Sequence, residues 1–225
     1  MSRGKRRHAG YEWSWPGADV TIAVVPITSE DMVRAAARVH LEAFVRSEST
    51  RIGHRYVRRF IDWFRCCQDA IALAACAGEE VCGYVVGAPV GYQLQMYRDL
   101  LLVAASSLIT RPVVLLHADV REMARTRLEM LLGRTVSGET EPSLPRPTMV
   151  LDTIGVSPKW QGRQVGDRLM EVFEAEARAR QMKSLRLTVL KSNAAARHLY
   201  ERRGWQPWVS ETGKRMHCFL LNAER

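Results

Sequence analysis

A short loop near the end of the chain carries groups suited to bind an anion. The segment Met149–Val156 is apolar and rich in β-branched residues, which predicts a strand, and a helical pattern begins near Gly166. The loop Gln161–Gly166 therefore presents unpaired backbone amides at the positive end of a helix. Gly162 and Gly166 let a phosphate approach closely, and Gln161 and Arg163 add polar and cationic partners. A plain strand-to-helix turn has a similar composition, so the loop alone leaves both interpretations open.

A second pair of residues lies further along the chain at helical spacing. Asn193 comes after a predicted strand at 184–190 and caps a short helix that ends at Gly204. Tyr200 comes seven residues after Asn193, two helical turns, so both side chains project from about the same face. An ordinary helix would also contain an asparagine N-cap and a buried tyrosine, so these residues alone leave structural and functional interpretations open.

Taken together, the two motifs are similar to those of a known family. The sequences V-S-P-K-W-Q-G-R-Q-V-G-D-R-L-M and L-T-V-L-K-S-N-A-A-A-R-H-L-Y-E-R-R-G-W resemble the GNAT superfamily of acyl-CoA-dependent N-acyltransferases, in the family's order and spacing. The resemblance covers residues 149–209 in its motifs and residues 20–88 in the order of its elements. It implies an N-acetyltransferase that uses acetyl-CoA as the acetyl-donor cosubstrate. The odd number of cysteines without a secretory leader predicts that the protein is cytoplasmic.

The resemblance also implies where acetyl-CoA binds. The family's mixed sheet splays between the strand ending at Val156 and the next parallel strand, and the pantetheine lies in the split against backbone groups of Ile154 and Val156. The pyrophosphate is expected on the backbone amides of Gln161, Gly162, Arg163, Gln164, Val165 and Gly166. The family pattern has glycine where this chain has Gln164, although a backbone amide is present there too.

The resemblance gives Asn193 and Tyr200 functional roles. The asparagine would hydrogen-bond the cofactor, and the tyrosine phenol would protonate the departing thiolate. A substrate ammonium must also lose a proton, and we predict that Asp152 accepts it, on a strand face shared with Ile154 and Val156. A solvent-facing or ion-paired role for Asp152 is the alternative. His40 and Glu42, on a helix that borders the acceptor site in the family, are further candidates, and a structural histidine is the alternative for His40.

The order of predicted elements agrees with an α/β fold. Strand 20–25 precedes a helix with apolar residues at 32, 36, 39 and 43, and a second helical pattern runs through 56–64. Strands at 70–76 and 81–86 come next, joined by a short turn. A strand, helix and strand then form a parallel crossover over 149–190. We predict a mixed, splayed β-sheet flanked by helices.

Residues 89–147 are expected to be an insertion into a single domain. Two helices separated at Arg111-Pro112 form a helical hairpin, because proline ends helices, and a Pro-rich linker at 141–148 leads back to the sheet. Residues 1–19 are predicted to be a flexible basic tail and residues 20–225 one N-acetyltransferase domain. Such an apolar hairpin should border the acceptor site or a subunit interface. The oligomeric state, monomer or homodimer, stays open.

Charge and cysteine content limit the other classes of function. The chain has 225 residues and a formal net charge of +9, but no signature of a nucleic-acid-binding fold, so we expect no dedicated nucleic-acid role. No apolar stretch is long enough to span a membrane, and no signal peptide is apparent. The five cysteines lack metal-ligand spacing and are expected to be reduced thiols, with no metal site.

The acceptor is a primary amine whose identity the sequence leaves open. The segments V-H-L-E-A-F and R-I-G-H-R-Y, together with the hairpin, resemble GNAT members that act on nucleotide-linked amino sugars of surface polysaccharides. The alternatives are a protein amine, a small drug-like or polyamine substrate, or a non-catalytic CoA-binding regulator.

Overall fold

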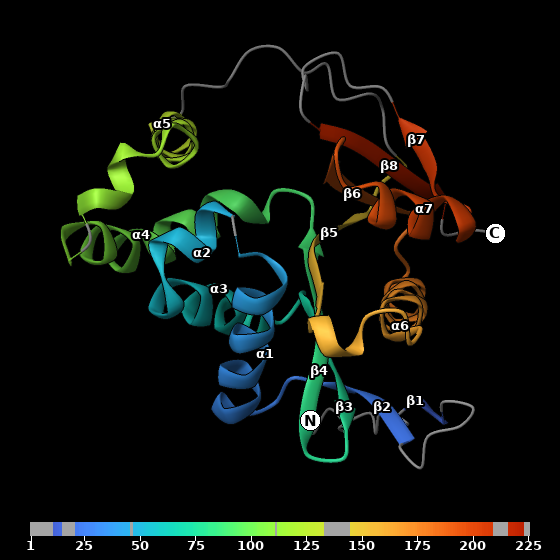
Figure 1. Ribbon diagram of the computed structural model, residues 1–225. Helices are drawn as coiled ribbons and strands as arrows, with labels where there is room; N and C mark the ends of the chain where they lie inside the picture. Colours follow the sequence, from blue (N-terminus) through green and yellow to red (C-terminus); the bar gives the residue numbers. More distant parts are fainter. Residues whose placement is uncertain are drawn as a thin grey trace, which may run out of the picture.

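One mixed sheet with helices on both faces forms the body of the protein (Figure 1). The computed structural model describes residues 11–14, 21–45, 47–110, 112–132, 145–208 and 216–222. Its strands are β1 (Tyr11–Ser14), β2 (Thr21–Pro26), β3 (Ile71–Ala77), β4 (Glu80–Pro89), β5 (Thr148–Val156), β6 (Ser184–Leu190), β7 (Gln206–Trp208) and β8 (Met216–Asn222). Its helices are α1 (Glu30–Ala43), α2 (Glu48–Ile52), α3 (His54–Cys66), α4 (Tyr92–Thr110), α5 (Ala118–Leu131), α6 (Val165–Ala179) and α7 (Ala194–Arg202), with 3₁₀ turns η1 (Pro112–Leu116) and η2 (Pro158–Trp160).

The strand order of the sheet is β1-β2-β3-β4-β5-β6-β8-β7. Strands β5 and β6, which flank α6, pair in parallel, and the other neighbouring strands are antiparallel. This arrangement confirms the prediction of a mixed α/β sheet. It also confirms a parallel strand, helix and strand unit in the last third of the chain.

Two apolar clusters hold the helices to opposite faces of the sheet. Leu169 and Phe173 of α6 belong to one cluster, and Phe64 of α3 belongs to the other. Neighbouring residues of β4 divide between them, with Val85 in the first cluster and Val86 in the second, as the two-residue period of a strand requires. In Figure 1 the helices α1, α3 and α4 accordingly lie on one side of the sheet and α6 on the other.

The helices between β4 and β5 pack against the rest of the protein. Tyr92, Met96 and Leu100, at helical spacing on α4, are buried in the cluster that includes α3, and Val120 of α5 is buried as well. The predicted break near Pro112 is confirmed, since η1 begins there. That this pair is an insertion into the family fold stays a prediction. Several large apolar side chains of the pair are exposed, among them Leu101, Leu102, Ile109, Val113 and Leu116.

Three local features differ from the sequence prediction. Strand β1, Tyr11–Ser14, pairs with β2 inside the segment predicted to be a flexible tail, so that prediction is wrong for these four residues. Helix α2 was not predicted; it is only 5 residues long, too short for a periodic apolar pattern. Strand β5 begins at Thr148, inside the predicted linker. Residues 1–10, 15–20, 111 and 133–144 of these predictions lie outside the described residues.

Candidate active site

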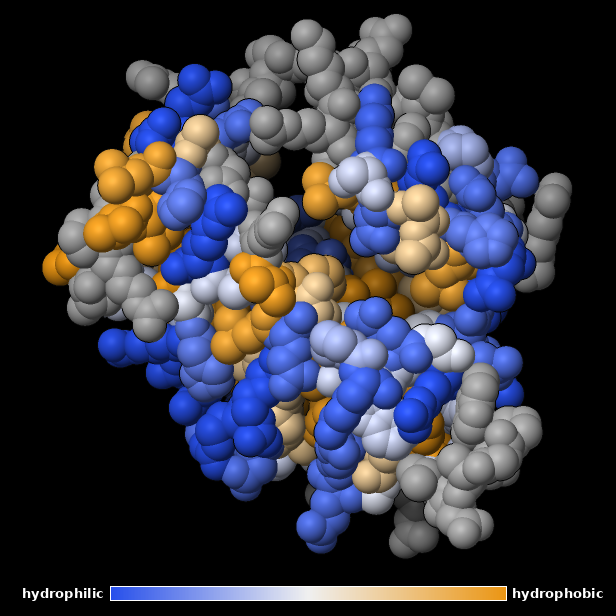
Figure 2. All heavy atoms as spheres, in the orientation of Figure 1, coloured by the Kyte–Doolittle hydropathy of each residue, from blue (hydrophilic) through white to orange (hydrophobic). Residues whose placement is uncertain are grey.

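Strands β5 and β6 separate in the middle of the sheet. Their parallel pairing ends with Leu151 opposite Leu187, although β5 continues to Val156 and β6 to Leu190. Beyond this point β5 stays paired with β4, and β6 with β8. In Figure 2 the molecule is hollowed between the side formed by α4 and α5 and the side formed by β6 and α7. The described pairing thus agrees with the splayed sheet that the sequence predicted.

A β-bulge at Asp152 coincides with the start of this separation. Val86 of β4 lies opposite Thr153, and Gly87 lies opposite Leu151, so Asp152 is an extra residue on β5. A bulge increases local twist and redirects side chains. It therefore places the carboxylate of Asp152 at the point where the two parallel strands part.

The bulge corrects the predicted direction of Asp152. We expected it to share a strand face with Ile154 and Val156, but these two residues pack against the cluster that contains α6. Asp152 instead accepts a hydrogen bond from the hydroxyl of Tyr92, which belongs to the cluster on the opposite face. The prediction was wrong because it assumed uninterrupted two-residue alternation, which an extra residue reverses.

The carboxylate of Asp152 is held by two hydroxyl donors. The Tyr92 hydroxyl donates to Oδ1, and the Thr153 hydroxyl donates to Oδ2 at 2.9 Å. Burial raises the pKa of Asp152, while these hydrogen bonds and the charge of Arg127 oppose the rise. A carboxylate with a raised pKa is a better proton acceptor than an exposed aspartate, which suits general base catalysis.

Helix α6 begins at a loop whose backbone amides lack hydrogen-bond acceptors among the described residues. The Gln161 side chain donates to the Val156 carbonyl oxygen at 3.2 Å, and the Arg163 guanidinium lies 5.0 Å from the centre of the Trp160 ring. Within the described residues, the backbone hydrogen bonds have no donor from Gly162 through Asp167, because helical pairing starts with the Arg168 amide on the Gln164 carbonyl. These free amides at a helix N-terminus fit a pyrophosphate.

Gln164 is the N-cap of α6 and has a left-handed backbone, with φ of 59°. An L-residue in this region pays about 1 kcal/mol that glycine does not. This explains why the family pattern has glycine here. The same backbone is present at Gln181, where φ is 60° at the other end of α6.

We predict that Gln164→Gly stabilises the protein by about 0.5 kcal/mol, because relief of backbone strain exceeds the added entropy of the unfolded chain. Affinity for acetyl-CoA should be preserved or slightly improved. Gln181→Gly is the matched control: it should give a similar gain in urea unfolding with no change in affinity. A loss of stability in Gln164→Gly would contradict the strained backbone.

We predict that Gly166→Glu weakens acetyl-CoA binding at least tenfold, or about 1.4 kcal/mol. A Cβ at Gly166 would lie at ordinary contact distance, 3.5 Å from Leu199, so the fold should accept a side chain. A carboxylate in the first turn even suits the helix dipole, but it repels a pyrophosphate. Gly166→Gln, which adds similar bulk without charge, is the control in calorimetric titrations. Equal affinity of Gly166→Glu and the wild-type protein would place the phosphates elsewhere.

Asn193 is the N-cap of α7 and Tyr200 lies within that helix, as predicted. The Asn193 side chain accepts a hydrogen bond from the Ala196 amide at 3.1 Å, so it caps the helix, and its amide group remains a donor. Tyr200 is 4% exposed, and its ring lies 6.1 Å from that of Trp205. Burial raises the pKa of Tyr200 to about 12, so the phenol keeps its proton at neutral pH. Their roles toward acetyl-CoA stay predictions.

Both ring nitrogens of His40 are engaged by hydroxyl groups, which favours the structural alternative. Its Nδ1 is bonded to the Tyr84 hydroxyl and its Nε2 to the Ser49 hydroxyl at 2.8 Å. Burial lowers the pKa of His40 to about 4, so the ring is neutral at pH 7. Glu42 is exposed and accepts a hydrogen bond from the Ser157 hydroxyl at 2.7 Å, which links α1 to the end of β5.

We predict that protonation of His40 destabilises the protein in mild acid. The folded pKa is about 4 and the unfolded one 6.5, so the unfolded chain binds the proton first and stability falls as the pH drops through this window. The loss from pH 7 to pH 5 is about 2 kcal/mol. Urea unfolding of His40→Gln should lack this part of the pH dependence, whereas the exposed His54→Gln should keep it. Equal slopes for all three proteins would contradict the assignment.

Several residues beside Asp152 were not singled out from the sequence. The carboxylate of Asp152 interacts electrostatically with side chains of three helices: its charge adds to the rise that burial causes in the pKa values of Tyr56 on α3 and of Tyr92 and Tyr97 on α4. The charge of Arg127 on α5 in turn opposes the rise that burial causes in the pKa of Asp152. Arg186 of β6 also acts on Tyr92. Tyr92 and Tyr97 belong to no recognisable sequence motif. The only sequence signal for a functional role was their position in a helix expected to border the acceptor site.

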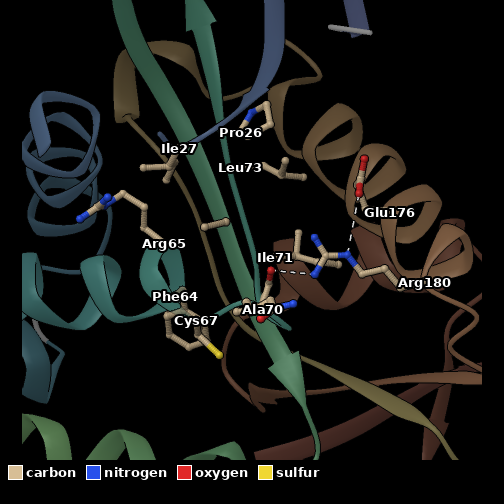
Figure 3. A pocket seen from close by; sticks show the side chains of 12 residues that line it. Pro26, Ile27, Phe64, Arg65, Cys67, Ala70, Ile71, Leu73, Glu176 and Arg180 are labelled. Atoms are coloured by element: carbon tan, nitrogen blue, oxygen red, sulfur yellow. Dashed lines mark hydrogen bonds and ion pairs between the residues drawn. The ribbon is translucent and has the colours of Figure 1, made fainter. Parts of the chain in front are cut away.

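A separate cavity of about 200 Å³ lies at the start of β3 (Figure 3). The charged side chains that line it already have partners. Arg180 donates to the carbonyl oxygens of Asp69 and Ala70 and pairs with Glu176, and Arg65 pairs with Asp62. The cavity therefore offers little unpaired charge to a ligand.

Two other kinds of feature are absent from the part of the chain that the structure describes. In the described ranges, no group of three or more His, Cys, Asp or Glu side chains could hold a metal ion. Among the same residues, no helix is both long and apolar enough to cross a membrane.

Comparison with protein families identifies the region that contains this site. The model of the "Acetyltransferase (GNAT) family" matches residues 126–205, which include Asp152, the loop before α6, and both Asn193 and Tyr200. Among curated protein sequences, none matches the chain significantly.

Solved structures share the fold at low sequence identity. The GNAT domain of S. lividans PAT has a TM-score of 0.57 and 18% identity, covering 95% of this chain and 96% of that one. The ribosomal-protein-S18-alanine N-acetyltransferase of Escherichia coli has a TM-score of 0.54 and 14% identity, covering 90% and 94%. The PaiA N-acetyltransferase of Thermoplasma acidophilum, solved with coenzyme A, has a TM-score of 0.51 and 10% identity, covering 89% and 98%.

Proposed function

We propose that this chain, whose residues 126–205 match the model of the acetyltransferase (GNAT) family, transfers an acetyl group from acetyl-CoA to a primary amine bound beside Asp152. The observation that carries this proposal is the position of Asp152, on a bulge where β5 and β6 separate. Its carboxylate faces α4. The free amides at the start of α6 fit the pyrophosphate of acetyl-CoA. When bound, acetyl-CoA would supply an activated acetyl thioester.

The residues divide the proton transfers between them. Asp152 takes the proton from the substrate ammonium, and its two hydroxyl donors keep the carboxylate oriented while each oxygen retains a lone pair. The free amine attacks the acetyl carbonyl and the carbon–sulfur bond breaks, while the Tyr200 phenol gives its proton to the departing thiolate. The new amide nitrogen releases its remaining extra proton, which restores the phenol directly or through water, and Asp152 returns its proton to solvent. The pKa of about 12 at Tyr200 keeps that proton available.

We further propose that the acceptor is an amino sugar linked to a nucleotide. Two observations support this choice over a peptide or a polyamine. Helices α4 and α5 contribute tyrosines and an arginine to the surroundings of Asp152, which suits a ring with hydroxyls and a negative charge. The chain's net charge of +9 also disfavours a polycationic acceptor.

The test is release of coenzyme A from acetyl-CoA with a panel of amines. A UDP-linked amino sugar should be consumed fastest, and spermidine and an N-terminal alanine peptide slowly. Faster turnover of the peptide or of spermidine would overturn the sugar proposal and keep the acetyltransferase. Binding of acetyl-CoA without turnover of any amine would favour a regulator instead.

A further inference from the structure

Arg127 on α5 is a cation beside the proposed acceptor site without a carboxylate partner. Its guanidinium donates to the Tyr56 hydroxyl at 2.5 Å, and no ion pair of the described residues includes it. Arg125, two residues earlier on the same helix, instead pairs with Glu129 and is 75% exposed. Arg127 therefore differs from the arginines on the outer face of α5.

Two aromatic rings hold the guanidinium of Arg127 in place. Its centre lies 4.8 Å from the centre of the Tyr97 ring and 5.5 Å from that of Tyr56. Cation–π contacts and a neutral hydroxyl fix the direction of the group without neutralising it. Since a guanidinium has five N–H donors, most of them remain for another acceptor.

The charge of Arg127 reaches the surroundings of Asp152. Burial raises the pKa values of Tyr97 and of Asp152, and the Arg127 charge opposes both rises. The two charged groups are close enough to interact but do not form an ion pair. The cation Arg127 and the proposed base Asp152 are thus held apart beside the point where β5 and β6 separate. Figure 2 shows hydrophilic residues inside the hollow of the molecule.

We infer that Arg127 binds the phosphate of the acceptor while Asp152 receives the proton of its amine. This inference rests on the proposed function and assigns the site a substrate class, an amine that also carries phosphate. A planar guanidinium recognises phosphate oxygens through two parallel hydrogen bonds. The fixed separation of the two groups then selects acceptors by the distance between amine and phosphate.

The test compares acceptors that differ only in their anion. Four acceptors are assayed: a UDP-linked amino sugar, its sugar 1-phosphate, a carboxylate-bearing analogue and the free amino sugar. Each is tested with the wild-type protein, Arg127→Met, Arg127→Lys and the control Arg125→Met. We expect Arg127→Met to raise KM at least about tenfold more for the phosphate-bearing acceptors than for the free amino sugar, with the KM of acetyl-CoA nearly unchanged. Arg127→Lys should recover part of the loss, and Arg125→Met should behave as wild type.

Each other outcome has a defined meaning. An equal effect of Arg127→Met on the charged and free sugars would overturn the inference and leave Arg127 as a packing residue between Tyr56 and Tyr97. A selective effect on the carboxylate analogue alone would exclude phosphate. If no amine is acetylated, the proposed function fails, and calorimetric titration of the UDP-linked sugar into the wild-type protein and Arg127→Met still decides whether Arg127 binds it. Should Arg127→Met fail to fold, the Arg127→Lys comparison gives the same decision.

Discussion

Replacement of Tyr200 by phenylalanine is expected to lower turnover at least about 10²-fold, in the range for loss of a general acid. The affinity for acetyl-CoA should change little, because the ring still packs beside Trp205. Burial raises the pKa of Tyr200 to about 12, so the wild-type rate should show no alkaline loss from this group between pH 8 and pH 10.

The measurement is the pre-steady-state rate of coenzyme A release, with affinity and unfolding determined separately. Unchanged turnover of Tyr200→Phe, with chemistry rate-limiting, would return Tyr200 to a packing role.

Asp152→Asn is expected to reduce turnover by about 10² to 10⁴-fold without loss of stability. Asparagine is nearly isosteric and can accept the Tyr92 hydrogen bond, but it cannot take a proton. Burial raises the folded pKa of Asp152 above its unfolded value, so the folded state binds the proton first. The stability contributed by Asp152 therefore falls as the pH rises from its unfolded pKa through its folded pKa. An asparagine has no charge to bury, so Asp152→Asn should lack this loss of stability.

The pH–rate profile distinguishes this role from mere packing. The acid limb that reports ionisation of Asp152 should disappear in Asp152→Asn, while Asp99→Asn, on the neighbouring helix α4, should keep the profile of the wild-type protein. Asp99 is a suitable control because its carboxylate is exposed and accepts a hydrogen bond from the Trp63 indole. A variant Asp152→Asn with full activity would exclude Asp152 as the base.

The sequence predicted the parts of the site that depend on local pattern. The loop at Gln161–Gly166 and the helix capped by Asn193 are where we expected them, because strand-to-helix turns and N-caps are determined by neighbouring residues. The sequence also showed that Gln164 replaces glycine. The left-handed backbone that makes this replacement costly was visible only in the structure.

The parts that depend on register or on distant contacts were not predictable in the same way. No local signal indicates that Asp152 is an extra residue relative to β4, since the bulge exists only in the pairing of two strands. The approach of Arg127 to Tyr56 joins residues 71 positions apart in sequence and depends on how α5 packs. The face predicted for Asp152 was thus wrong, its role as the base stays a prediction, and Arg127 was not named.

The bulge makes this site depend on the number of residues in β5 as well as on their identity. Removing the residue at position 152 would leave Leu151 opposite Gly87 and Thr153 opposite Val86, so β4 and β5 would pair without interruption. The deletion would therefore spare the register of the sheet and remove only the bulge and its carboxylate. When relatives are aligned to this chain, a gap at this position would mark a regular strand that lacks the proposed base.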